Sequence, residues 1–179
     1  AAADEPAATK QTAAQPEPSL PTPPIGAAAG VQPVCVADFR TIAQTKLPRP
    51  TFEFIETGSA DQVTLRENTA AFQRLKLLPP VLSGVAATDL STTVLGQKIT
   101  MPILLAPVAA QRMYHPQGAL AAARAAATMG TVFGVSSSAA NSIEEIAAAA
   151  TGPKWYQLYV PKDRGVARRL VERAEQAGF

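Results

Sequence analysis

Three segments carry groups that could bind a flat, polar ligand, and each lies where a predicted strand ends. Residues 106–110 read Ala-Pro-Val-Ala-Ala, in which Pro107 has a fixed φ and the small side chains let backbone N–H groups approach a ligand. This segment could equally be an ordinary loop. Residues 136–138 offer three hydroxyls for a carbonyl or imide edge, or for capping the next helix. Because Asn141 and Ser142 directly precede that helix, we expect them to cap it and Ser136 to remain available for a ligand.

The third segment shows the alternation of a strand. Trp155, Gln157 and Tyr159 share one face of it, and the residues between them share the other. The interior of a parallel barrel usually carries Val, Ile or Leu. An unpaired polar group buried there costs about 1–3 kcal/mol. We therefore expect a bound ligand to pair with Gln157 and Tyr159, with internal hydrogen bonds as the alternative.

Residues that usually bind metals or act as bases are few. His115 is the only histidine, and no carboxylate is spaced to orient it, so we interpret it as structural. A single cysteine, Cys35, excludes an intrachain disulfide, and one His with one Cys excludes zinc chemistry. The net charge is +2 without a run of Lys or Arg, so no nucleic-acid partner is expected. The arginines at 164–173 alternate with glutamates, as on a solvated helix face.

The elements that must position these groups alternate along the chain. Apolar strands are predicted at 102–106, 131–136 and 154–160, and helices at 117–129, 142–150 and 164–177. Such alternation predicts a parallel sheet covered on both faces. Three units leave both sheet edges open, and a closed (β/α)₈ barrel takes about 250 residues. The predicted fold class is therefore α/β, the N-terminal portion of a (β/α)₈ barrel.

Three helices and a hairpin are predicted before the first strand. The helices cover 38–46, 52–55 and about 59–75, and the hairpin covers 92–99. Ser59 and Gln62 have the spacing of a capping box for the third helix. We expect Val63, Leu65 and Phe72 of that helix to be buried.

The chain divides into a disordered Ala/Pro-rich linker, residues 1–33, and a domain, residues 34–179. Seven of the sixteen prolines and no aromatic residue fall in the linker, so it cannot repay the entropy of ordering. The first residue is Ala, which favours an upstream segment that was removed, either on export to the periplasm or as part of a tag or truncation. No apolar stretch approaches the roughly 20 residues of a membrane span. A fourth strand is expected near residue 180, so the chain is interpreted as cleaved, split or truncated.

Three separated motifs occur in the order found in a known family. They read Ser-Ala-Asp-Gln-Val-Thr-Leu-Arg-Glu-Asn at 59–68, Met-Pro-Ile-Leu-Leu-Ala-Pro-Val-Ala at 101–109 and Gln-Leu-Tyr at 157–159. With these motifs, residues 38–179 resemble the FMN-dependent α-hydroxy acid oxidases and dehydrogenases, such as glycolate oxidase, lactate oxidase and mandelate dehydrogenase. The resemblance implies a (β/α)₈ barrel with FMN at its C-terminal mouth, in a homotetramer. It implies oxidation of a small L-2-hydroxy acid to the 2-oxo acid, with O₂ or an electron carrier as acceptor.

The resemblance also implies roles for individual residues. Five of them would bind the cofactor: Pro107, Val108, Ala109, Ser136 and Gln157. The Ala109 backbone N–H would lie near the reactive flavin nitrogen, while Ser136 and Gln157 would hydrogen-bond the polar edge of the ring. Tyr159 would bind the substrate and act in catalysis, because its phenol would stabilise the developing alkoxide or carbonyl. Donors aimed at the electron-rich ring raise the flavin's potential.

The chain departs from the family pattern at two substrate positions. Phe54 stands where the family usually has a Tyr that binds the substrate carboxylate, so a hydrogen bond worth about 1.5–3 kcal/mol is missing. Ser138 stands where the family often has an aromatic residue, which would widen the pocket. Both changes favour a larger or less acidic substrate, or weak activity.

Other family residues would lie beyond Phe179: the proton-abstracting His, the carboxylate-binding Arg residues, the Lys near the flavin and the phosphate-binding segment. The chain would therefore need a second chain, or the lost remainder, for activity. Two alternatives stay open: a flavin-binding pseudoenzyme, and a different FMN barrel such as an isomerase. The segments 61–68 and 157–159 disfavour the isomerase, because they resemble the hydroxy acid family more closely.

Overall fold

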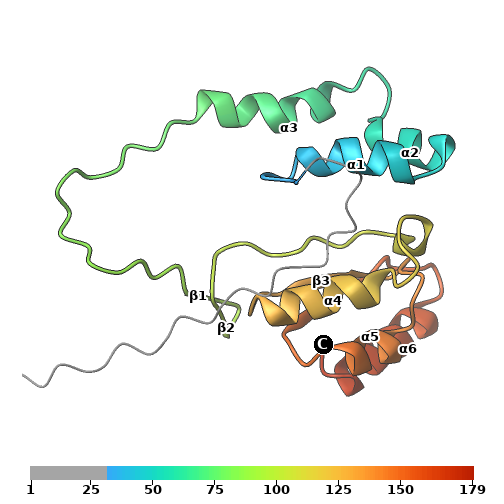
Figure 1. Ribbon diagram of the computed structural model, residues 1–179. Coiled ribbons are helices and arrows are strands. Elements are labelled where there is room, and N and C mark those ends of the chain that lie inside the picture. The colour runs from blue at the N-terminus through green and yellow to red at the C-terminus, as the bar shows by residue number, and fades with distance from the viewer. Residues whose placement is uncertain (1–31) are drawn as a thin grey trace, which may run out of the picture. The chain divides into compact units, whose positions relative to one another are not determined.

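The computed structural model describes residues 32–179 (Figure 1). The chain falls into two compact units, divided between Thr45 and Lys46. The predicted linker, 1–33, lies almost wholly outside the described residues. The first unit contains most of α1 (Asp38–Lys46). Ahead of this helix, the Asp38 carboxylate accepts hydrogen bonds from the Val34 and Cys35 backbone N–H groups at 2.7 and 2.9 Å. The Cys35 and Val34 bonds lower the pKa of Asp38.

The second unit begins with two helices and a hairpin. The helices are α2 (Arg49–Glu56) and α3 (Val63–Arg74), and the hairpin strands are β1 (Thr92–Val94) and β2 (Gln97–Ile99). The predicted hairpin is confirmed, and its strands are antiparallel and joined by a two-residue turn. Leu95 and Gly96 both have positive φ, 47° and 79°, which is the geometry of tight hairpin turns.

The predictions for α3 were wrong in two respects. Gln62 does not serve as the third residue of a capping box, because it is left-handed at φ 57° and its N–H donates to the Ser59 carbonyl in a turn. The helix therefore starts at Val63 without a side-chain cap. The three residues expected in a core are exposed: Val63, Leu65 and Phe72.

The rest of the unit alternates helices and parallel strands. In order, these are η1 (Gln111–Met113), α4 (Ala119–Thr128), β3 (Phe133–Ser136), α5 (Ile143–Ala149), β4 (Lys154–Gln157) and α6 (Arg164–Gln176). β3 and β4 are parallel, with Phe133 opposite Lys154 and Ser136 opposite Gln157. The helices predicted at 117–129, 142–150 and 164–177 and the strand predicted at 131–136 are confirmed with small changes at their ends, whereas the strand predicted at 154–160 ends at Gln157.

The predicted strand at 102–106 is reduced to a single parallel bridge between Leu105 and Phe133. Leu105 N–H donates to the Val132 carbonyl at 3.0 Å, and Gly134 N–H donates to the Leu105 carbonyl at 2.8 Å. The next donor of the ladder would be residue 107, but Pro107 has no N–H. On the other side, Ile103 N–H donates to Met101 within its own segment. The segment therefore lies beside β3 without forming a full strand.

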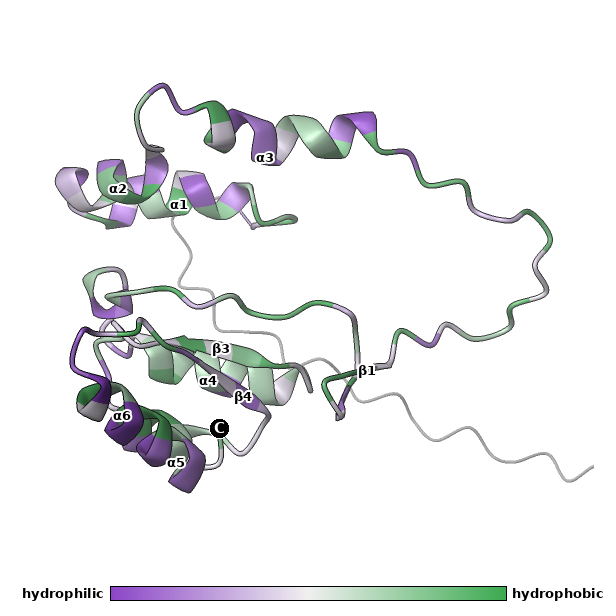
Figure 2. Ribbon diagram, turned by 180° about the vertical axis from the view of Figure 1, so that it is seen from behind, coloured by the Kyte–Doolittle hydropathy of each residue, from purple (hydrophilic) through white to green (hydrophobic). Residues whose placement is uncertain are grey.

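A core of small and branched residues lies between the sheet and the helices. Its buried members are Ala119, Ala123, Ala126, Phe133, Val135 and Ile146. The alanines recur at helical spacing on α4, so their short side chains form one face that packs on β3. Figure 2 shows the apolar character of β3 and α4 and the alternation of apolar and hydrophilic residues on α5 and α6.

Between residues 32 and 179, no helix has the length and apolar character needed to cross a bilayer. The same residues contain no cluster of three or more His, Cys, Asp or Glu side chains that could hold a metal ion.

Candidate functional site

The ends of β3 and β4 bring two predicted site residues together. Ser136 ends β3, is 6% exposed and stands opposite Gln157 in the parallel register. The Ser136 hydroxyl donates to Gln157 Oε1 at 3.4 Å. The Ser137 backbone N–H donates to the Gln157 backbone carbonyl at 3.0 Å and also lies 3.4 Å from that Oε1. Within residues 32–179, the Gln157 amide nitrogen has no hydrogen-bond partner. The amide oxygen is therefore held toward β3, and its N–H groups can donate to a ligand.

The segment 106–110 lies against the same strand end. A Cβ on Gly134 would stand 2.9 Å from Pro107 Cδ and 3.0 Å from the Leu105 carbonyl, so glycine lets the segment approach β3 closely. Ala110 N–H donates to the Ser138 carbonyl at 3.1 Å, which ties the segment to the loop after β3. Pro107, Val108 and Ala109 are exposed between these anchors. In the described part of the chain, the Ala109 N–H has no hydrogen-bond partner.

Tyr159 lies two residues beyond β4, and its side chain is exposed. Tyr159 as a whole is 69% exposed, and its backbone N–H lies 3.4 Å from the Ser137 hydroxyl. The strand was predicted to continue to residue 160, but it ends at Gln157. Beyond that residue the Tyr159 backbone N–H reaches a side-chain hydroxyl, that of Ser137, and no longer a backbone carbonyl of β3. Phe54 lies on α2, is 67% exposed and is not brought into this cluster.

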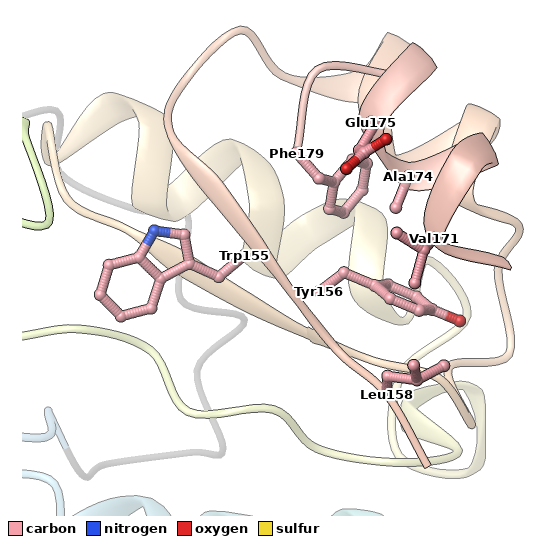
Figure 3. A pocket seen from close by; sticks show the side chains of 7 residues that line it. All are labelled: Trp155, Tyr156, Leu158, Val171, Ala174, Glu175 and Phe179. Atoms are coloured by element: carbon pink, nitrogen blue, oxygen red, sulfur yellow. The ribbon is translucent and has the colours of Figure 1, made fainter. Parts of the chain in front are cut away.

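The two faces of β4 are as the alternation predicted. Trp155 points away from Tyr156 (Figure 3), and its indole N–H donates to Gln97 Oε1 of β2 at 3.0 Å. Tyr156 packs toward α6 and meets the Phe179 ring edge-on, with centroids 6.2 Å apart. A groove of about 250 Å³ between β4 and α6 is lined by Trp155, Tyr156, Leu158, Val171, Ala174, Glu175 and Phe179.

The predicted caps of α5 are half correct. Ser142 is the N-cap, because its hydroxyl accepts from Glu145 N–H at 3.1 Å and its N–H donates to the Glu145 carboxylate at 2.8 Å. These contacts lower the pKa of Glu145, and the Ser142 N–H is the main cause. Asn141 does not cap α5. Its Oδ1 accepts from Ala119 N–H of α4 at 3.2 Å, a partner too distant in sequence for local capping rules to find.

Three other ionisable residues of the unit have defined partners. His115 Nδ1 accepts from Gln117 N–H at 3.2 Å, in keeping with a structural role. Arg173 is not simply solvated, because it binds the Glu144 carboxylate of α5 through two nitrogens at 2.9 and 2.8 Å. This pairing holds the pKa of Glu144 at about 2.

Lys154 is a buried cation that the sequence reasoning missed. At the start of β4, its ammonium donates to the Ala150 and Gly152 carbonyls at 2.9 and 2.7 Å. Burial lowers the pKa of Lys154. Its position at the opposite end of the strand from Gln157 gives it a structural role.

Comparison with known proteins relates the arrangement to a family of enzymes. The FMN-dependent dehydrogenase family matches residues 43–179. Glycolate oxidase 1 of Zea mays is 48% identical over 144 residues, covering 80% of this chain and 39% of the maize protein. Glycolate oxidase of Spinacia oleracea is 47% identical with the same coverage. The chain thus spans about two fifths of the length of these relatives.

Solved structures agree with the sequence comparison. A crystal structure of mandelate oxidase superposes with a TM-score of 0.78 at 36% identity, covering 82% of this chain and 43% of that one. These likenesses confirm the predicted fold class, the N-terminal portion of a (β/α)₈ barrel. The described residues form part of that barrel and do not close it.

Proposed function

Because this chain belongs to the FMN-dependent dehydrogenase family, we propose that it supplies the first part of the flavin site of an enzyme that oxidises an L-2-hydroxy acid to the 2-oxo acid. The family's cofactor is FMN. One observation carries the proposal for these residues. At one sheet edge, the buried Ser136 hydroxyl and the Gln157 amide meet beside an exposed backbone segment, 107–109. Such a pairing of polar groups with a close-lying backbone suits the imide edge and face of a flavin ring.

The donor set fits the cofactor. Gln157 Nε2 and the Ala109 N–H have no partner among residues 32–179, and both are donors. The Ser136 hydroxyl accepts from the Ser138 backbone N–H at 3.1 Å, and its own proton makes only a 3.4 Å bond to Gln157, which it can exchange for a stronger one to a ligand. Pro107, Val108 and Ala109 would line the ring, and Ser136 and Gln157 would bind its polar edge.

When bound, FMN accepts the two electrons removed from the substrate's α-carbon. The residues of this chain would orient the ring and stabilise the charge that develops during the reaction. The Gln157 and Ala109 N–H groups would orient the ring and favour added negative charge on it. The exposed Tyr159 phenol would donate a hydrogen bond to the substrate oxygen at the carbon that is oxidised, and so stabilise the charge that develops there.

The substrate would be larger or less acidic than glycolate or lactate. Phe54 has no hydroxyl with which to bind a carboxylate, and Ser138 is small and exposed beside the strand ends. We propose that these two residues widen the substrate pocket and weaken its hold on a small acid. The electron acceptor would be O₂ or an electron carrier.

A further polypeptide segment would complete the barrel. β4 pairs with β3 and has no strand on its other side among the described residues. The groove of about 250 Å³ beside it carries the exposed faces of Tyr156 and Phe179 (Figure 3). An open parallel edge next to an apolar groove is suited to another strand and helix. We propose that a following segment or a second chain supplies them, together with the base and the phosphate site, in a homotetramer.

Denaturing mass spectrometry on the natively purified protein tests this assembly. We expect a mass matching FMN and, if the barrel is split, a second polypeptide. A protein isolated without flavin, and unable to take up added FMN, would contradict the proposal.

The second candidate is a flavin-binding protein without hydroxy acid turnover, which Phe54 favours because it lacks the carboxylate ligand. Turnover of a panel of 2-hydroxy acids of increasing size separates the two. Bound flavin that no member of the panel reduces would support the binding protein.

A further inference from the structure

Asn141 joins two loops at the strand ends, although it lies outside the groups proposed to touch the flavin. The residue is 6% exposed and stands between β3 and α5. Its Oδ1 accepts from the backbone N–H of Ala119, the first residue of α4, at 3.2 Å. The first N–H groups of a helix lack partners within the helix, so this bond satisfies one of them from a distant loop. The loop after β3 is thereby fastened to the end of the loop 106–118.

The contact is close enough to require a glycine beside it. Gly118 precedes α4 with φ 52° and ψ −131°, a conformation that side chains rarely adopt. A Cβ on Gly118 would stand 2.9 Å from Asn141 Oδ1 and 2.9 Å from Arg112 Cγ. The amide is therefore packed against the backbone at the end of the loop.

The same loop is held at its other end. Ala110 N–H donates to the Ser138 carbonyl at 3.1 Å, and Pro107 lies against Gly134. Asn141 and Ser138 belong to one short loop, so both ties run from that loop to 106–118. Residues 107–109, which would line the flavin, lie within the segment held by these ties.

The amide nitrogen of Asn141 is buried and poorly paired. Within residues 32–179 it makes no hydrogen bond of ordinary geometry, although the amide lies close enough to the Glu145 carboxylate to help lower the pKa of that group. A buried donor without a good partner is unfavourable, so the favourable contribution of this side chain to the fold comes mainly from its oxygen, which accepts from Ala119 N–H.

We propose that Asn141 is a positioning residue that holds the loop 106–118 against the loop after β3, and thereby fixes the backbone of 107–109 on the flavin. The effect on the flavin rests on the proposed function, whereas the contact that holds the loop, from Ala119 N–H to Asn141 Oδ1, is present in this chain. Asn141 itself touches neither flavin nor substrate in the proposed site.

The test compares three variants of the native protein, purified with any polypeptide that accompanies it. Asn141→Ala removes the acceptor, Asn141→Asp retains one, and Lys154→Met is the control. Lys154 makes two hydrogen bonds from a buried position at the other end of β4. Its loss should lower stability without reaching the loop. The measurements are amide hydrogen exchange over 106–118, FMN affinity by fluorescence titration, the flavin midpoint potential and kcat.

For Asn141→Ala we expect faster exchange over 106–118, an FMN Kd raised about tenfold, a lower midpoint potential and a kcat reduced between about ten- and a hundredfold, because small misplacements of a site are costly. Asn141→Asp should recover much of the exchange protection. Lys154→Met should lower the melting temperature while leaving exchange over 106–118, potential and FMN affinity unchanged.

Two outcomes would overturn the inference. One is exchange over 106–118 that Asn141→Ala leaves unchanged. The other is a flavin potential and affinity in Asn141→Ala that match Lys154→Met. If the wild-type protein binds no flavin, the proposed function fails. The exchange result alone then decides whether Asn141 holds the loop.

Discussion

Replacing Gly134 with alanine should damage both the stability of the fold and the flavin site. The added Cβ would stand 2.9 Å from Pro107 Cδ, 3.0 Å from the Leu105 carbonyl and 3.1 Å from Pro107 N. Two of these three atoms belong to the backbone, so the strain cannot be relieved by turning a side chain. Inserting a methyl group into such a contact typically costs about 1–3 kcal/mol. For a protein of this size or larger, each kcal/mol lowers the melting temperature by about 2–4 °C.

The segment that must move to relieve the strain is the one that would line the flavin. Gly134→Ala should therefore weaken FMN binding in addition to lowering the melting temperature. Gly152→Ala is the matched control, because a Cβ there would stand 2.9 Å from Ala127 Cα and 3.0 Å from Ala127 Cβ. That clash lies in the turn between α5 and β4, at the other end of the sheet.

The assays are thermal unfolding and fluorescence titration with FMN, on the native protein and both variants. We expect similar losses of stability and a loss of FMN affinity in Gly134→Ala alone. Wild-type FMN affinity in Gly134→Ala, or an equal loss in Gly152→Ala, would refute the reasoning that Pro107 is positioned by its contact with Gly134.

Three further predictions concern other parts of the molecule. Phe54→Tyr should raise kcat/KM for small 2-hydroxy acids about ten- to a hundredfold in steady-state assays, since a hydrogen bond to a charged group contributes about 1.5–3 kcal/mol; an unchanged value would remove Phe54 from the substrate site. Ser142→Ala should cost about 0.5–2 kcal/mol in urea unfolding through loss of the α5 cap, and a stability equal to wild type would contradict that role. The pKa of Glu144 is lowered from 4.5 to about 2, so its pairing with Arg173 stabilises the fold above pH 4.5 and is lost as the pH falls toward 2; Glu144→Gln should remove this part of the acid sensitivity of the urea midpoint, and an unaltered pH profile would refute it.

Local and periodic signals accounted for most of the fold. Parallel strands that alternate with helices must present their carboxyl ends at one edge, so the pattern predicted that polar groups would gather there. The pairing of Ser136 with Gln157 depends on the register and on the end of β4 at Gln157, which the predicted strand 154–160 did not give. The Ser142 cap could be recognised because its partner, Glu145, is three residues away. The faces of β4 followed from alternation, and Trp155 and Tyr156 do point to opposite sides.

The features that were missed depend on contacts between distant residues. Asn141 stands where a local cap is expected, but its partner is 22 residues earlier in the chain. Arg173 was interpreted as solvated because helical spacing relates only residues three or four apart, and its partner Glu144 lies 29 residues away on another helix. The apolar residues of α3 recur at helical spacing, which correctly predicts a helix. The spacing does not reveal which element covers these residues, and Val63 and Phe72 are exposed. The shortened strand at 102–106 had a signal in the sequence, since Pro107 cannot donate to a ladder.

The central claim is that this chain's strand ends form part of an FMN site for the oxidation of 2-hydroxy acids. Anaerobic titration of the natively purified protein with L- and D-2-hydroxy acids, followed by flavin absorbance, tests it most directly. The account predicts bound FMN that one or more L-2-hydroxy acids reduce, and a slower or absent reduction in Gln157→Leu. Flavin that no L-2-hydroxy acid reduces, or a protein that binds no flavin, would contradict it.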